Sequence, residues 1–70
     1  MKIYGVFIGD DFEGGTCLST LFKLKKDAQM QAAAIAKSEN EEHQSRFELD
    51  DSEIWRDNYD YIRVMEYELI

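Results

Sequence analysis

Several places in the chain hold side chains that could do chemistry, and the first is His43 with its acidic neighbours. Glu39 precedes His43 by four residues, and Glu42 precedes it directly. On a helix, the spacing of four would put the Glu39 carboxylate and the His43 imidazole on one face, as two ligands of a metal ion. A metal site needs three or four ligands, and no second His or Cys lies nearby in the sequence. We therefore expect a solvated histidine and no metal or other cofactor.

The turn-like run from Gly9 to Gly15 holds three carboxylates, those of Asp10, Asp11 and Glu13. They loosely resemble a calcium-binding loop, but the Asp-x-Asp-x-Asp-Gly spacing and the Glu at the twelfth position are absent. The run also lacks the Lys-Ser/Thr pair of a phosphate-binding loop. We expect it to form the polar turn of a β-hairpin.

Cys17 is the only cysteine in the chain. A reactive thiolate needs a base or a positive charge beside it, and the neighbouring Thr16 and Leu18 supply neither. No Gly-x-Ser-x-Gly motif is present, and a chain of 70 residues has little room for a walled pocket. We expect no catalytic residues and no enzymatic activity. A single cysteine cannot form an internal disulfide, which favours a reducing compartment such as the cytoplasm.

The strongest signal is the acidic segment from residue 39 to residue 60. Nine carboxylates against Arg46 and Arg56 give this segment a net charge of −7, equal to that of the whole chain. Apolar side chains such as Phe47 and Trp55 are interleaved with the charges. The segment is either a solvated face with core anchors or a binding surface with aromatic anchors inside a charged rim. In the second case the partner-binding residues are Glu39, Glu41, Glu42, Glu48, Asp50, Asp51, Glu53, Trp55, Asp57 and Asp60.

The sign of this charge limits the class of partner. Direct binding to nucleic acid needs a basic surface that neutralises phosphates, so we do not expect it here. Carboxylates spaced along a surface can instead occupy a basic groove meant for nucleic acid, as phosphate mimics, and we expect a basic protein partner. No apolar run approaches the ~20 residues of a membrane span, so we expect no membrane partner.

The hydrophobic pattern predicts the elements that position these residues, and the longest is a helix. Residues 25–37 are rich in Ala, Met, Gln and Lys, which favour helices, and contain no Pro or Gly. We expect the helix to end between residues 38 and 44. The apolar stripe through which it would pack on a sheet consists of Leu24, Ala28, Ala32 and Ile35.

Strand-like runs lie on both sides of this helix. Residues 3–8 have apolar side chains on both faces, which predicts a central strand with cover on each side. In residues 16–22, simple alternation places Leu18 and Leu21 on opposite faces. The remaining pattern predicts a short strand at residues 47–49, a loop at 56–60 and a final strand at 61–69.

We therefore expect residues 1–70 to form a single domain with an α+β fold. It would consist of a small antiparallel sheet of three or four strands, in the order ββαβ or ββαββ, with one helix packed on one face. A chain this short has modest stability, and a homodimer would be one ordinary way to add to it.

A resemblance to known proteins is carried by Lys2-Ile3-Tyr4-Gly5-Val6-Phe7, Gly9-Asp10 with Glu13-Gly14, Leu21-Phe22-Lys23 with Lys26 and Ala28, Tyr61-Ile62, and Glu66-Tyr67-Glu68-Leu69. In these stretches the chain resembles a group of small uncharacterised bacteriophage and prophage proteins of the ββα(β)β type. Residues 37–58 are unmatched, and the group has Ser or Thr at the helix cap where this chain has Lys23 or Leu24. The resemblance implies a phage-like origin and brings no catalytic residue. Short acidic phage proteins are often inhibitors of host systems.

Charge and resemblance together favour a small acidic inhibitor of phage type that acts in the host-cell cytoplasm. It would block a basic, nucleic-acid-handling host or defence protein by mimicking nucleic acid, and a CRISPR effector is one such target. The alternative is a structural or assembly module that acts through self-association and has no inhibitory role. An enzyme with a hidden site ranks last.

Overall fold

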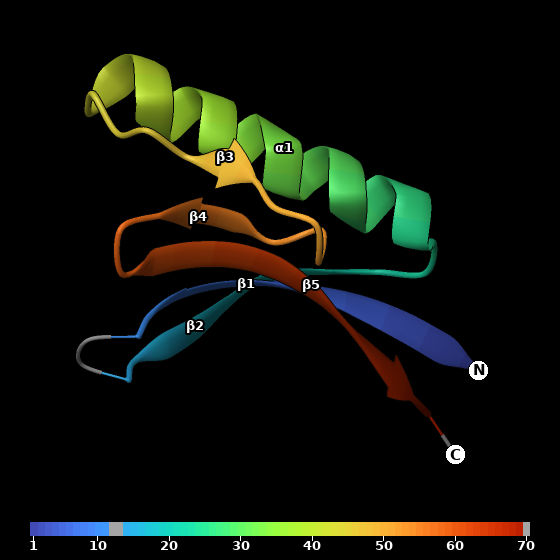
Figure 1. Cartoon of the computed structure of the whole chain (residues 1–70). Coiled ribbons are helices and arrows are strands. Elements are labelled where there is room, and N and C mark those ends of the chain that lie inside the picture. Colours follow the sequence, from blue (N-terminus) through green and yellow to red (C-terminus); the bar gives the residue numbers. More distant parts are fainter. Residues whose placement is uncertain (12–13, 70) are drawn as a thin grey trace.

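The computed structural model describes residues 1–11 and 14–69, and it contains one helix that lies across one face of a five-stranded antiparallel sheet (Figure 1). The elements in chain order are β1 (Lys2–Asp10), β2 (Thr16–Phe22), α1 (Lys25–Glu42), β3 (Glu48–Leu49), β4 (Trp55–Asp57) and β5 (Asp60–Glu68). The strands are arranged in the order β2-β1-β5-β4-β3. The predicted α+β fold is confirmed. Glu13, expected in the hairpin turn, lies outside the described residues.

The sheet has one strand more than expected because part of the predicted loop at 56–60 is paired. Arg56 and Asp57 belong to β4, which pairs with β5 on one side and β3 on the other. The turn between β4 and β5 contains Asn58 with a φ of 57°. Asn tolerates this left-handed backbone better than most residues, which permits a tight hairpin between the two strands.

The helix begins and ends much as its composition predicts. Leu24 stands at the N-cap in an extended conformation, with φ −115° and ψ 132°, and no side chain caps the first turn. The helix ends at Glu42, within the predicted interval, and the backbone N–H of His43 donates to the carbonyl of Glu39 at 2.9 Å.

The buried stripe of α1 differs from the predicted one at its start. Ala28, Ala32 and Ala36 are buried, whereas Leu24 is 60% exposed. Leu24 was wrongly assigned to the stripe because its extended backbone does not follow the helical period. Ala36 continues the row of every fourth residue instead, and Ile35 is partly buried beside it.

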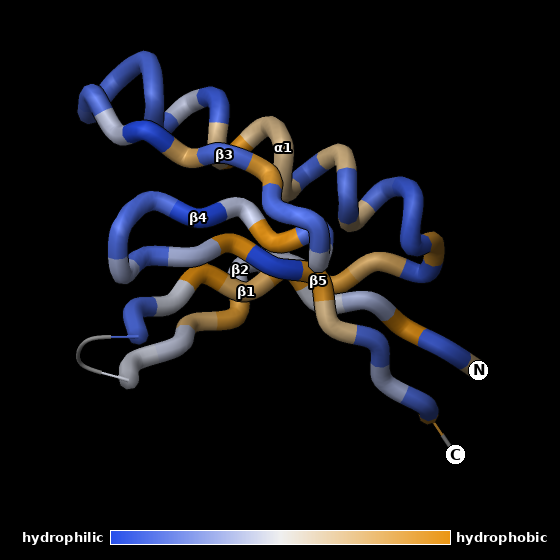
Figure 2. The backbone as a smooth tube through the Cα atoms, in the orientation of Figure 1, coloured by the Kyte–Doolittle hydropathy of each residue, from blue (hydrophilic) through white to orange (hydrophobic). Residues whose placement is uncertain are grey.

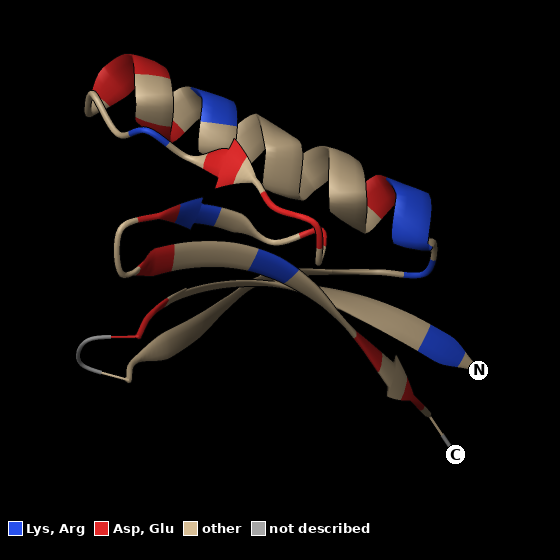
Figure 3. Ribbon diagram, viewed as in Figure 1, with Lys and Arg blue, Asp and Glu red and all other residues tan. Residues whose placement is uncertain are grey.

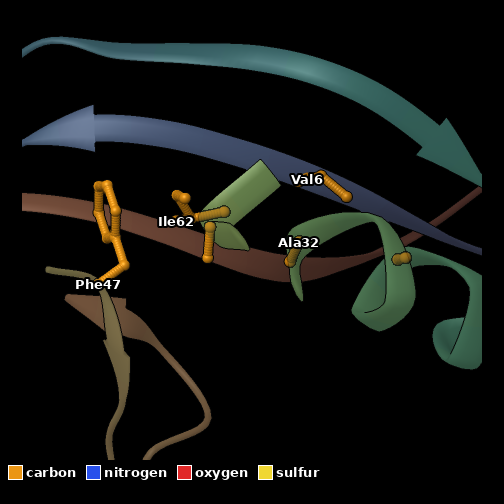
Figure 4. Close-up of a cluster of buried hydrophobic side chains, with 6 residues drawn as sticks. Val6, Ala32, Phe47 and Ile62 are labelled. Carbon is orange, nitrogen blue, oxygen red and sulfur yellow. The ribbon is translucent and has the colours of Figure 1, made fainter. Parts of the chain in front are cut away.

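Small side chains on the helix bring it close to the sheet. The three alanines pack against Val6 of β1 and Ile62 of β5, which are the largest fully buried side chains, and against Phe47 (Figure 4). Asn40 of the helix fixes the chain at Phe47: its Oδ1 accepts from the Phe47 N–H at 2.8 Å, and its Nδ2 donates to the Phe47 carbonyl at 3.2 Å. These paired hydrogen bonds tie the segment before β3 to the helix.

Strand β1 is central, as predicted, since it pairs with β2 and with β5 along its length. The prediction of cover on both faces was wrong. The helix covers the face that carries Val6, while no element among the described residues packs on the face that carries Ile3 and Phe7 (Figure 1). The physical reason is that residues 48–68 form strands that widen the sheet instead of a second covering layer.

A β-bulge changes the expected alternation in β2. Val6 pairs with Thr20 and the next residue, Phe7, pairs with Leu18, so Ser19 is an extra residue in β2. The bulge turns Leu18 to the same face as Leu21, and the expectation that these leucines lie on opposite faces was wrong. Hydrophobic residues recur along β1 and β2 (Figure 2).

Candidate protein-binding surface

The carboxylates of the acidic segment are divided between separate places on the molecule (Figure 3). One group lies where the end of α1 approaches the β4–β5 turn, another lies on the loop between β3 and β4, and Glu48 lies apart from both on β3. We call the first group, with Asp10 added, the acidic end; it consists of Asp10, Glu39, Glu41, Glu42, Asp57 and Asp60. We call the second group the loop group; it consists of Asp50, Asp51 and Glu53.

The acidic end is built on three neighbouring strands. Asp60 of β5 pairs with Asp10 of β1 on one side and with Asp57 of β4 on the other. Like charges directly opposite one another in an antiparallel sheet destabilise it. Desolvation raises the pKa of the Asp60 carboxyl above its ordinary value, and the negative charges of Asp10, Asp57 and Glu39 raise it further. Three strands thus hold like charges side by side where they repel.

Asp10 was expected in the hairpin turn, and it is instead the last residue of β1. No local sequence pattern marks its role, which comes from the pairing of the first strand with the last that sets Asp10 opposite Asp60. The backbone closes this end of the sheet further: the Asp11 N–H donates to the Tyr59 carbonyl at 2.8 Å. Asp10, Asp57, Asn58, Tyr59 and Asp60 line a hollow of about 400 Å³ there.

Near the C-terminal end of α1, Glu39 adds negative charge to the same region, since its charge acts on Asp60. Glu39, Glu41 and Glu42 lie in the last turns of the helix, and the last turn has no basic side chain. The negative end of a helix dipole disfavours acidic groups at this position. Glu39 makes an exposed contact with His43, with 4.0 Å between Oε2 and Nε2.

The suspected metal ligands Glu39 and His43 do lie near each other, with His43 at the C-cap just after α1. Within residues 1–11 and 14–69, however, no group of three or more His, Cys, Asp or Glu side chains is placed to hold a metal ion.

Cys17 is exposed on the edge strand β2.

Asp50 of the loop group shapes the β3–β4 connection. Its Oδ1 accepts from the Ser52 N–H at 2.8 Å and from the Ile54 N–H at 3.0 Å. Its Oδ2 accepts from Nε of Arg56 at 3.0 Å, and the same guanidinium donates to Asp11 at 3.0 Å. The hydrogen bond from Ile54 lowers the pKa of Asp50 most, and Ser52 and Arg56 lower it further. This carboxylate is therefore engaged within the chain.

The other predicted acidic residues are more accessible. Glu53 lies 4.0 Å from Nζ of Lys25 and accepts a 3.4 Å hydrogen bond from Gln29, so it faces the first half of the helix. Asp51 is exposed beside it, and Glu48 is exposed on the short strand β3. The structure therefore does not bring all the predicted partner-binding carboxylates together.

Trp55 lies apart from the acidic end, on the helix side of the sheet. It is half-buried and packs against the core. With Ala32, Leu49 and Val64 it lines a mainly apolar hollow of about 300 Å³ between α1 and the β3–β4 hairpin. Its position meets the expectation of partial burial, and it packs against the core.

The chain matches no protein-family model, and no curated protein or solved structure is significantly similar to it. Among the described residues, no helix combines the length and the apolar character that crossing a bilayer requires.

Proposed function

We propose that the protein is a small acidic inhibitor that binds a basic, nucleic-acid-handling protein of a host or a defence system and blocks its nucleic-acid surface. One observation carries the proposal: Asp10, Asp60 and Asp57 lie in register on three adjacent strands, where desolvation, together with the negative charges of Asp10 and Asp57, raises the pKa of Asp60. The acidic end would be the contact surface.

The energetics of the acidic end support a role in binding. Aligned carboxylates and an acidic helix C-terminus both reduce the stability of the isolated chain. Within the described residues, no ion pair neutralises Asp57 or Asp60. A basic partner would supply the missing positive charge, so the arrangement that is unfavourable alone becomes favourable in a complex.

The geometry of the acidic end also suits a phosphate mimic. Neighbouring strands hold the three aspartates about 5 Å apart in a fixed row. The backbone N–H of Arg46 donates to Oδ2 of Asp57 at 3.2 Å, which restrains that side chain. A rigid row of negative charges attracts a basic surface at long range and accelerates association. The resemblance to phage proteins is consistent with an inhibitor of a host system.

The test is capture of proteins from a bacterial lysate on the immobilised chain, followed by elution with duplex DNA. The variant combines Asp10→Asn, Asp57→Asn and Asp60→Asn, and a matched control combines Glu48→Gln, Asp51→Asn and Glu53→Gln, which removes the same charge. We expect DNA to release a nucleic-acid-binding protein from the parent and the control, and the variant to retain little of it. Equal retention by both variants, or capture that DNA does not reverse, would contradict the proposal.

A second candidate function is a structural or assembly module that acts through self-association. A different feature supports it, namely the apolar sheet face that α1 leaves uncovered. Leu18 and Leu21 on this face are 49% and 51% exposed. The two functions use opposite sides of the sheet and can be tested separately.

A further inference from the structure

We infer that the uncovered face of the sheet packs against the same face of a second copy of this chain, to give a homodimer with two sheets face to face. We call this surface the open face. Strand register places its six main apolar side chains together, and they are Ile3, Phe7, Leu18, Leu21, Met65 and Tyr67.

The open face is a continuous layer and not a set of scattered side chains. Gly5 lies at its centre, where a Cβ would stand 2.8 Å from the Phe7 ring and 3.1 Å from Cδ1 of Leu18, so both side chains lie over the glycine. The rings of Phe7 and Tyr67 approach to 6.1 Å between centroids at an angle of 54°. The hydroxyl of Tyr67 lies 3.8 Å from the sulfur of Met65. Contiguous exposed apolar patches of this kind mark interaction sites on soluble proteins.

The charge distribution is compatible with a second copy as the occupant of this face. The chain has a net charge of −7, so most of its surface repels another copy. The carboxylates of β5 lie on the opposite side of the sheet, since Glu66 pairs with Tyr4 and faces the helix side. The open face carries Arg63 beside Phe7, and at its β3–β4 edge it carries Glu48 and Arg56, whose guanidinium is paired with Asp11 and Asp50. Two copies therefore meet with least repulsion at this face.

Arg63 is also a cation that the aromatic rings of a facing surface would contact. Its Nε atom is buried against the apolar layer and has no hydrogen-bond partner among the described residues. Tyrosine rings attract a guanidinium, and a second copy brings Tyr61 and Tyr67 to the same face. Arginine, methionine and aromatic residues are the types enriched in the centres of protein interfaces.

The area of the open face and the small size of the core are both consistent with a dimer. The apolar part of the open face lies on β1, β2 and β5, which span roughly 30 Å in length and roughly 14 Å in width, so its area is on the order of 400 Å². Standard interfaces bury about 800 Å² per partner, so this face supports a weak dimer of about half that size. The single-copy core contains three alanines beside Val6, Ile62 and Phe47, and small cores often gain stability by oligomerisation.

The test is the mass of the whole chain in solution, by sedimentation equilibrium at roughly 100 μM, where an interface of micromolar affinity is formed. The double variant Leu18→Lys/Leu21→Lys places two charges on the open face. The control Met30→Lys changes a helix residue that is 62% exposed. We expect a dimer for the parent and for the control, and a folded monomer, checked by circular dichroism, for the double variant.

A monomeric parent would overturn the inference and leave the open face to a different protein. Dissociation of the control to the same extent as the double variant would also overturn it. Salt separates this interface from the acidic end: because salt screens repulsion between two acidic chains, the dimer should persist or strengthen as salt rises. Substitution of Asp10, Asp57 and Asp60 by Asn should leave the dimer intact, so either proposal can fail while the other stands.

Discussion

Asp60 of β5 lies directly opposite Asp10 of β1, so the first and last long strands bring two carboxylates together at one end of the sheet. Asp57 joins them from β4. The sheet positions charges here that reduce its own stability, and this is the feature that distinguishes the acidic end from an ordinary solvated surface.

The acidic end makes a prediction about stability and pH. The folded-state pKa of Asp60 is raised, so the folded chain holds more protons than the unfolded chain between the two pKa values. The free energy of unfolding should therefore fall as pH rises through that window. Asp60→Asn should raise the melting temperature at about pH 7 and make little difference at about pH 3. Asp51→Asn, on the exposed loop, is the control and should have a smaller effect. A lower melting temperature for Asp60→Asn at neutral pH would show that the charge on Asp60 does not destabilise the folded chain.

Asp50 gives the opposite dependence. Its folded-state pKa is lowered by the hydrogen bond from Ile54, and by Ser52 and Arg56. Its contribution to stability is present above the unfolded-state pKa and is lost as pH falls through the folded-state pKa. Asp50→Ala should therefore lower the melting temperature at about pH 7, and the difference from the parent should shrink in acid. Asp50→Asn keeps one acceptor oxygen and should be milder. A pH-independent difference for Asp50→Ala would contradict this account of its charge.

The alanine row of α1 predicts a large effect from one buried charge. Ala32 is 2% exposed and packs in the core, whereas Ala34 is on the exposed side of the same helix. Ala32→Glu should lower the free energy of unfolding by about 3–5 kcal/mol because it buries an unpaired carboxylate. Ala34→Glu adds the same group in water and should change stability by less than about 0.5 kcal/mol. Chemical denaturation measures both. Similar midpoints for the two variants would refute this placement of the helix.

Two glycines should respond differently to the same substitution. A Cβ at Gly9 would meet the ring of Tyr61 and lie 2.9 Å from the carbonyl oxygen of Gly15, which is backbone and cannot rotate away. A Cβ at Gly5 would meet mainly the side chains of Phe7 and Leu18. We expect Gly9→Ala to lower the free energy of unfolding by about 1–3 kcal/mol, and Gly5→Ala by less.

The Gly9 substitution has a local readout as well. It should displace the Tyr61 hydroxyl from Oγ1 of Thr16, to which it is hydrogen-bonded at 2.5 Å. Chemical denaturation gives the stabilities and NMR shifts of Thr16 report the displacement. A larger loss for Gly5→Ala would contradict the predicted order.

The local sequence pattern was enough to predict the helix and strands that depend on the propensities of their own residues. The bounds of β2 and the extent of α1 follow from strand and helix propensities near those residues. The sequence pattern did not predict β4 because a strand of three residues is too short to show an alternation of apolar and polar side chains. The turn that follows it also depends on the left-handed backbone of Asn58. The bulge at Ser19 leaves no mark in the alternation of β2.

The candidate site needed long-range information. The row of Asp10, Asp57 and Asp60 exists because β5 lies between β1 and β4, and no local pattern specifies that order. The two-faced pattern of β1 did predict an apolar second face. Whether another element covers that face depends on how the rest of the chain folds, and here those residues extend the sheet.

The most direct test of the central claim is the salt dependence of affinity for the partner recovered by elution with DNA. The dissociation constant would be measured by titration calorimetry at about 50 mM and about 500 mM salt, for the parent and for the variant with Asp10, Asp57 and Asp60 replaced by Asn. We predict that salt weakens the parent complex strongly, and that the variant binds weakly with much less dependence on salt. Equal affinity of the parent at both salt concentrations, or a greater loss from replacing Glu48, Asp51 and Glu53, would contradict binding through the acidic end.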